Sequence, residues 1–229
     1  MRLVTWNAND NNRHRSFEAN VELLKKLDPD LIILSETARP ISTDHDQLVC
    51  LGTGSPSLAV IARGKYRILP ARVYPDAPMY FGAFRVSGPC SLNLLAGWPV
   101  QVKGVSTYSG LLQDALNIFD EYLRDKRTAF AGDLNTSSKA KGQETTHPGF
   151  VARLARLGLT SIYHHQNNET QGREKIITYR GGRGFHLDYA FLSKDLLSSA
   201  TVEVINGPEW QASSDHFPVL VELSDDNRA

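Results

Sequence analysis

The order of segments at the N-terminus constrains the fold most, because a short apolar segment, a helical pattern and a second apolar segment follow one another. Residues 2–6 are β-prone and stop at a polar stretch. From Ser16, which can cap a helix, apolar residues recur at helical spacing until a proline ends the pattern. Residues 31–34 form a continuous apolar run, as in strands buried on both faces. This order predicts a β-α-β unit whose strand ends carry Asn7 and Glu36.

The rest of the chain first predicts strands without helices and then mixes the two. Short β-branched or aromatic runs cover residues 57–61, 66–69, 81–86 and 92–96, an arrangement typical of antiparallel pairing. Helices are predicted at 110–124 and 148–157, around a strand at 128–131 and a polar, flexible-looking segment at 136–146. Later strands are predicted at 176–179, 186–192, 201–205 and 218–223. The pattern indicates an α/β (α+β) fold with mixed sheets covered by helices, in one domain over residues 1–229.

Several polar side chains share one placement, at or near the end of an apolar strand. They are Asn7, Glu36, Asp133, Asn135, Asp188 and the pair Asp215-His216. Strand ends are where ligand-binding loops gather in α/β sheets, so these groups are predicted to converge on one cleft. Carboxylate and amide oxygens are the ligands that Mg²⁺ and Mn²⁺ prefer.

Taken one at a time, most of these residues have ordinary explanations. Asn7 and Asp133 are typical of turns, and Glu36 at a strand end is usually a solvated charge. Asp188 differs because it lies in an apolar run, where a lone carboxylate is costly to bury without a partner. His216, at the start of the last strand, is the predicted partner.

Five sequence blocks then give a family resemblance. LVTWNAN, LIILSE, AGDLN, HLDYAFLS and SSDHFPVLVEL resemble, in order and over nearly the whole chain, the signature blocks of the endonuclease/exonuclease/phosphatase superfamily. That superfamily includes exonuclease III-type and pancreatic deoxyribonuclease-type enzymes. The resemblance implies a four-layer sandwich of two packed mixed β-sheets flanked by helices. It also implies hydrolysis of phosphodiester bonds with Mg²⁺ or Mn²⁺ as the cofactor.

The resemblance assigns catalytic roles to four residues. It implies that Asp133 positions and deprotonates the attacking water, and that Asn135 holds the scissile phosphate or this water. His216 is expected to donate a hydrogen bond to a non-bridging phosphate oxygen, while Asp188 accepts from its other ring nitrogen and fixes the tautomer.

The implied metal ligands are Glu36, with Asn7 beside it and Asp215 assisting. Asn9, two residues after Asn7, stands where nucleolytic relatives often have Asp, so one negative charge near the metal is missing. We place Asn9 among the substrate-binding candidates.

A second departure concerns the residue that contacts the phosphate. Family members usually place His or Tyr after the strand that precedes the second helix, and here Trp98 takes that position. An indole donates one hydrogen bond but transfers no proton, so Tyr108 is the alternative catalytic candidate. Phe185 and Arg39 complete the predicted substrate contacts. Phe185 and Leu187 stand where abasic-site endonucleases hold an apolar pocket, although a core position is preferred for Leu187.

Charge gives no global attraction to a polyanion, because 25 Lys and Arg balance 25 Asp and Glu. Nucleic acid must therefore be held locally. Basic residues do recur in loops beside the predicted site, as a solvated surface or a nucleic-acid groove: Arg13, Arg15, Arg39, Lys139, Lys141, Arg173, Lys175, Arg180 and Arg183. His164 and His165 are adjacent on a predicted strand and so point to opposite faces, which does not favour a second metal site.

Three functional hypotheses follow. The first is a nuclease that acts on DNA rather than RNA, as an abasic-site endonuclease or exonuclease in DNA repair. The second is a small-molecule phosphatase or phosphodiesterase, which the neutral charge allows. The third is a binding protein that has kept the fold and lost catalysis. Because there are only two cysteines, no apolar leader pattern and no spanning segment, we expect a cytoplasmic protein without membrane contact. We also expect a monomer.

Overall fold

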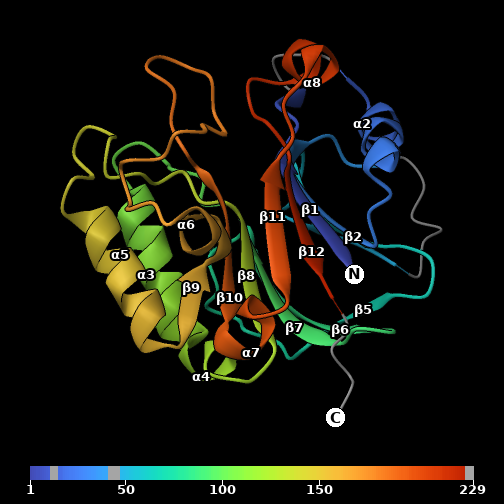
Figure 1. Ribbon diagram of the computed structural model, residues 1–229, viewed down its shortest axis with the longest axis horizontal. Coiled ribbons are helices and arrows are strands. Elements are labelled where there is room, and N and C mark those ends of the chain that lie inside the picture. Colours follow the sequence, from blue (N-terminus) through green and yellow to red (C-terminus); the bar gives the residue numbers. More distant parts are fainter. Residues whose placement is uncertain (11–14, 41–46, 225–229) are drawn as a thin grey trace.

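The computed structural model describes residues 1–10, 15–40 and 47–224, whose strands form two sheets of six (Figure 1). Sheet A contains β1 (Arg2–Asn7), β2 (Leu31–Thr37), β3 (Leu48–Leu51), β4 (Ser57–Ala62), β11 (Ala200–Val204) and β12 (Val219–Leu223). Sheet B contains β5 (Arg67–Pro70), β6 (Phe81–Ser87), β7 (Leu92–Gly97), β8 (Thr128–Asp133), β9 (Leu159–Ser161) and β10 (Asp188–Ser193). The strand orders are β11-β12-β1-β2-β4-β3 and β5-β6-β7-β8-β10-β9.

Each sheet has one parallel pair of strands, and a helical connection joins the two strands of each pair, as a parallel pair requires. In sheet A, β1 and β2 are parallel and the connection contains α2 (Phe17–Leu24) and a short 3-10 helix (Lys25–Leu27). In sheet B, β7 and β8 are parallel and the connection contains α3 (Tyr108–Ile118) and α4 (Asp120–Leu123). The other strand pairs are antiparallel. Both sheets are therefore mixed, as predicted.

The two sheets pack face to face, with β1 and β2 against β8 and with β12 against β10. Helices α3 and α5 (Thr146–Arg156) cover the outer face of sheet B, and α2 lies outside sheet A (Figure 1). Three shorter helices belong to the described part of the chain: α6 (Ile162–Asn167), α7 (Lys194–Leu197) and α8 (Pro208–Ser213). The α/β sandwich of two sheets flanked by helices confirms the predicted fold class.

Two hydrophobic cores hold these layers together. One lies mainly between the sheets and includes Trp6 and Leu34, both fully buried. The other lies between sheet B and its helices and includes Leu116, Phe130 and Phe150. Among the described residues, no helix is both long and apolar enough to cross a membrane.

The strand predicted at residues 176–179 is wrong. Tyr179 makes only isolated bridges, to Phe185 and to His216. The reason is the turn between them, where Gly182 and Gly184 adopt φ of +61° and +74° and return the chain after a few residues. Residues 176–179 thus form part of a loop beside the last strand, in spite of their β-prone composition.

Other differences are local. The helix predicted at 110–124 is divided at Phe119, whose φ and ψ of −98° and 13° interrupt it between α3 and α4. β3, β9 and the short helices were not predicted. His164 and His165 lie on α6 and not on a strand, which corrects the geometry assumed for them. The segment 136–146 starts with the buried residues Thr136 and Ser137, so its beginning is packed.

Candidate active site

Strand ends of both sheets meet at one point, as the sequence predicts. The side-chain amide Nδ2 of Asn7, at the end of β1, donates to Glu36 Oε1 at 3.0 Å and to Asp133 Oδ2 at 2.8 Å. Glu36 belongs to β2 and Asp133 ends β8, so one amide group links carboxylates from the two sheets. The site therefore lies across the junction of the sheets.

Unusual backbone conformations aim these side chains. Glu36 has φ of +50° and lies where the register between β2 and β4 shifts, so a bulge turns its carboxylate out of the regular strand alternation. Asn9 and Asn135 also adopt left-handed conformations, which Asn tolerates better than most residues. Such conformations concentrate at functional sites, where the surrounding structure holds them in place.

Gly132 allows β8 to approach β7 closely beside Asp133. Its φ is +150°, and a Cβ atom at this position would lie 1.8 Å from the carbonyl oxygen of Gly97. No side chain fits there without moving a strand. The position of Asp133 therefore depends on the glycine before it.

His216 and Asp188 form a buried pair. His216 Nδ1 lies 2.8 Å from Asp188 Oδ2, and both side chains are almost fully buried. Asp188 is held by its own backbone N–H, which donates to Thr178 Oγ1 at 3.0 Å, and the N–H of Leu187 donates to the same oxygen at 2.9 Å. The predicted partnership of Asp188 and His216 is present in the structure.

The backbone of His216 is tied to the first strand. Ser214 Oγ donates to the carbonyl of Asn7 at 2.7 Å and accepts from the N–H of His216 at 3.0 Å. The indole N–H of Trp6 donates to the carbonyl of His216 at 3.1 Å. The backbone of His216 is thus fixed relative to β1 by two independent contacts.

Asp133 and His216 have opposite electrostatic environments. Burial, followed by the charge of Asp188, raises the pKa of Asp133 to about 7, although His216 and the hydrogen bond from Asn7 lower it. Burial alone disfavours the imidazolium of His216, but the charges of Asp188 and Asp133 outweigh it and raise its pKa to about 9. Near neutral pH the site therefore contains an imidazolium beside a carboxyl group that can take or give a proton.

The donor set fits a divalent cation. Asn9 Nδ2 donates to Asp215 Oδ1 at 2.6 Å, which brings a further carboxylate to the loop after Asn7. Potential ligand atoms of Asp133, Asp188 and His216 all lie within 4.8 Å of one another. Asp188 Oδ1 is buried without a hydrogen-bond partner among the described residues. The charges of Asp188 and Glu36 both raise the pKa of Asp133, an arrangement that a bound cation would relieve.

Two tyrosines face the carboxylates. Burial, followed by the charges of Asp133 and Glu36, raises the pKa of Tyr108, the first residue of α3. Tyr179 packs against the His216 ring at 4.8 Å between centroids, and burial followed by the charge of Asp215 raises its pKa. Tyr179 was not among the predicted site residues, because its segment had the pattern of an ordinary strand.

The predicted substrate contacts have different positions. Phe185 is partly buried and stacks on Tyr179 at 6.3 Å, next to the site. The prediction that Trp98 contacts the substrate is wrong. Trp98 is 3% exposed, belongs to the core and packs on Tyr80, so it offers no surface on which a base could stack. The substrate contact predicted for Arg39 is also not found, because its guanidinium donates to the carbonyl of Gly52 and not toward the polar cluster. Leu187 is buried, as preferred.

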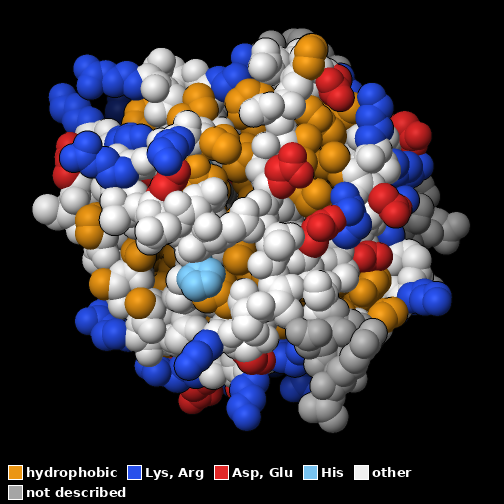
Figure 2. Space-filling view, in the orientation of Figure 1, with side chains coloured by type: hydrophobic (Ala, Val, Ile, Leu, Met, Phe, Trp, Pro, Cys, Tyr) orange, Lys and Arg blue, Asp and Glu red, His pale blue; other side chains and the backbone are white. Residues whose placement is uncertain are grey.

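One group of basic side chains lies on the loops beside the candidate site. Figure 2 shows Lys and Arg at its upper left, where Figure 1 shows the loops before α5 and after α6. The exposed basic residues of these loops are Lys139, Lys141, Arg173, Lys175 and Arg183. Arg13, also predicted near the site, lies outside the described residues. Arg180 is turned to the backbone, where it donates to the carbonyls of Gln211 and Ser214.

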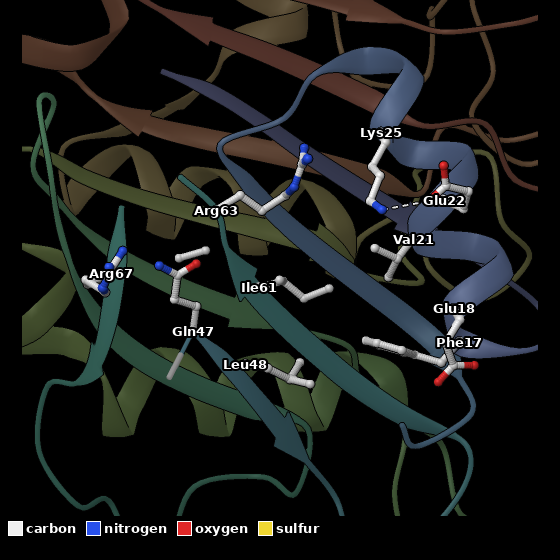
Figure 3. A pocket seen from close by; sticks show the side chains of 11 residues that line it. Phe17, Glu18, Val21, Glu22, Lys25, Gln47, Leu48, Ile61, Arg63 and Arg67 are labelled. Carbon is white, nitrogen blue, oxygen red and sulfur yellow. Dashed lines mark hydrogen bonds and ion pairs between the residues drawn. The ribbon is translucent and has the colours of Figure 1, made fainter. Parts of the chain in front are cut away.

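A separate hollow of about 530 Å³ lies between α2 and the outer face of sheet A (Figure 3). Its apolar lining includes Phe17, Val21 and Ile61. Of the charged residues that line it, Lys25 is paired with Glu22 at 2.6 Å. None of its lining residues belongs to the polar cluster.

No protein-family model and no curated protein matches the chain. Solved structures do. A 3'-5' exonuclease from Neisseria meningitidis is 18% identical with a TM-score of 0.70, over 98% of this chain and 100% of that one. An AP endonuclease from Archaeoglobus fulgidus is 17% identical with a TM-score of 0.73, over 98% and 99%. The endonuclease domain of the TRAS1 retrotransposon is 14% identical with a TM-score of 0.69, over 97% of each. The chain has the fold of these nucleases, which confirms the fold implied by the sequence resemblance.

Proposed function

We propose that the chain is a divalent-metal-dependent phosphodiesterase that cleaves DNA. The observation that carries the proposal is the meeting of Asn7, Glu36 and Asp133 beside the buried Asp188–His216 pair. Hydrolysis of a phosphodiester needs an activated water and positive charge near the phosphate oxygens. The residues of this cluster can supply the base and part of the charge.

Asp133 is the base in this proposal. The backbone N–H of Asn135 donates to its Oδ1 at 3.0 Å, and the side chain of Asn135 lies 3.3 Å from its Oδ2, so the carboxylate has a fixed orientation. Burial raises the pKa of Asp133, which makes this carboxylate a stronger base than an exposed one. The water gives a proton to Asp133 while its oxygen bonds to phosphorus. The bond from phosphorus to the leaving ester oxygen breaks, and that oxygen keeps the bonding electrons and takes up a proton from solvent.

His216 stabilises the charge that develops on the phosphate. Its Nδ1 is engaged by Asp188, which leaves Nε2 to donate to a non-bridging oxygen. A charged donor makes a stronger hydrogen bond to an oxyanion than a neutral one. Asp188 therefore acts through the orientation and charge of His216.

Glu36, Asn7 and Asp215 are the residues that would hold Mg²⁺ or Mn²⁺. When bound, such an ion supplies positive charge to phosphoryl oxygens and to the leaving group. The other residues of the cluster keep their roles in binding water and phosphate.

DNA is the proposed substrate for two reasons. One similar structure is a Neisseria 3' phosphatase bound to a product DNA hairpin, and another is Danio rerio TDP2 with a single-strand DNA product. The exposed basic loops beside the site could also follow a phosphate backbone. The second candidate function is hydrolysis of a small phosphoester, which the balance of 25 basic and 25 acidic residues favours.

A substrate panel tests the proposal. Supercoiled plasmid, an abasic-site duplex, a single RNA strand and bis(p-nitrophenyl) phosphate are incubated with the protein and Mg²⁺, Mn²⁺ or EDTA. We expect cleavage of DNA with either metal and none in EDTA. Turnover of the small ester without cleavage of any nucleic acid would instead establish the second candidate.

The roles within the site are tested by His216→Ala, with His165→Ala as the control because His165 is exposed on α6. We expect kcat on DNA to fall by about 10²-fold or more in His216→Ala, the usual contribution of such a group. The Kd for DNA in EDTA should change by less than about threefold. Equal losses of turnover and binding would show a structural role for His216.

A further inference from the structure

A short loop with two exposed valines stands beside the candidate site. The valine loop, residues 101–106, lies between β7 and α3. Val102 is 55% exposed and Val105 is 82% exposed. A single exposed aliphatic residue is ordinary on a protein surface, so the position and the rigidity of this pair decide its meaning.

The loop presents the valines in a defined way. The N–H groups of Val105 and Ser106 both donate to the carbonyl of Val102, at 3.0 and 2.9 Å, and the N–H of Val102 donates to Ser106 Oγ at 3.0 Å. Gly104 forms the tip with φ of +76°, and a Cβ atom there would meet nothing within 4 Å. The backbone is thus closed on itself while the tip extends into open space.

One end of the valine loop is hydrogen-bonded to the catalytic cluster, and the other end lies near it. At one end the carbonyl of Pro99 accepts from the side chain of Asn135 at 3.3 Å. At the other end Thr107 caps α3, whose first residue is Tyr108, and the pKa of Tyr108 responds to the charges of Asp133 and Glu36. The loop therefore lies at the rim of the place where a scissile phosphate would be held.

We propose that Val102 and Val105 form an apolar wedge that packs against the bases next to the scissile phosphate of a nucleic acid. This inference rests on the proposed function. Beside a phosphodiester in a nucleic acid strand, the apolar surfaces are the faces of the bases and sugars, and aliphatic side chains are known to insert between base steps. Exposed Lys103, between the two valines, can meet an adjacent phosphate. A small phosphoester has no neighbouring nucleotide, and therefore no base beyond its own ester groups that a wedge at the rim of the site would contact.

The test compares two substrates and two double variants. Val102→Ser/Val105→Ser removes the wedge without removing a buried group. Leu69→Ser/Val73→Ser is the matched control, because both residues are more than half exposed and lie away from the site. Across sheet B, Leu69 pairs with Arg85, Arg85 with Asn93, and Asn93 with Thr128. Thr128 starts β8, whereas Asp133 of the candidate site ends it, so Leu69 lies at the opposite end of the sheet from the site. Val73 lines a hollow with Ile118, at the far end of α3 from Tyr108.

We expect the wedge variant to lose about 5-fold or more in kcat/KM on an oligonucleotide, the lower end of the range for a base stacked on an aromatic side chain, because valine is smaller. Its kcat/KM on bis(p-nitrophenyl) phosphate should stay within about twofold, and the control should match wild type on both. In EDTA, wild type should increase the fluorescence of a 2-aminopurine placed beside the cleavage position, and the wedge variant should not.

Three outcomes would overturn the wedge. One is full activity of the wedge variant on the oligonucleotide, and another is an equal loss on both substrates, which would mean that the loop only shapes the site. A third is that the wedge variant loses self-association in sedimentation but still binds nucleic acid, which would mean that the two valines contact a second copy of the chain. If wild type cleaves neither substrate the proposed function fails, while the 2-aminopurine measurement in EDTA still decides whether the wedge contacts bases.

Discussion

His186 should make the protein sensitive to mild acid, and its environment allows the effect to be calculated. The side chain is 1% exposed and packs on Tyr163 at 4.3 Å and Tyr189 at 5.0 Å between ring centroids. Its Nδ1 lies 3.2 Å from the carbonyl of Ile176, while Nε2 has no partner among the described residues. Burial, the largest influence, lowers the pKa of His186 to about 4 from the ordinary 6.5, and the nearby His164 adds to it.

The direction of the effect follows from this lowered pKa. Between pH 6.5 and 4 this histidine binds a proton in the unfolded chain but not in the folded protein. Its contribution to the unfolding free energy is therefore complete above pH 6.5 and is lost as the pH falls from 6.5 through 4. A difference of about 2.5 pKa units corresponds to about 3 kcal/mol of unfolding free energy by pH 4. Glu174, which also lies near His186, titrates in a different pH range. Burial alone would raise the pKa of Glu174, but its hydrogen bond with His164 outweighs burial and lowers this pKa to about 2, so Glu174 affects stability only below its ordinary pKa of 4.5.

The assay is urea unfolding of wild type and His186→Phe at pH values from 4 to 8. Phenylalanine keeps an aromatic ring among Tyr163 and Tyr189 and does not titrate, so acid-sensitive groups elsewhere cancel in the difference. We expect the variant to gain about 3 kcal/mol relative to wild type between pH 7 and pH 4. A difference between the two proteins that stays constant over this range would refute the reasoning.

Three further predictions follow from the contacts around the site. Gly132→Ala should lower the unfolding free energy by about 3 kcal/mol, because its Cβ would lie 1.8 Å from the Gly97 carbonyl oxygen; denaturant unfolding measures this, and an unchanged midpoint would contradict it. Thr178→Val should lower the unfolding free energy by about 2 kcal/mol and reduce turnover, because two backbone N–H groups lose their acceptor. Thr178→Ser keeps the hydroxyl and should retain both stability and turnover. Equal behaviour of the two variants would disprove this. Millimolar Mn²⁺ should raise the melting temperature of wild type in differential scanning fluorimetry and have no effect on Glu36→Gln, so an equal rise in both would remove Glu36 from the metal ligands.

The sequence predicted the polar cluster well because its members follow strongly apolar strands. Asn7 and Asp133 each end such a strand, and the register of β8 with β10 places Asp133 opposite Asp188. What a strand-end position does not give is the direction of a side chain. Trp98 follows β7 as predicted, yet it turns into the core.

The remaining errors come from contacts between distant parts of the chain. Tyr179 meets His216 because a glycine turn brings 176–185 back beside the last strand, and the β-prone composition of this loop resembles that of a sheet strand. The bulge that turns Glu36 is equally invisible in local sequence, since it depends on how β2 pairs with β4.

The junction of the sheets also has a consequence for how activity is lost. Asn7 comes from one sheet and Asp133 from the other, at 2.8 Å between the amide nitrogen and the carboxylate oxygen. A slide of one layer past the other by a single ångström would separate these groups while leaving nearly all of the buried apolar surface covered. Turnover should thus report on the alignment of the two halves, and should disappear in dilute denaturant before spectroscopic signals of melting are seen.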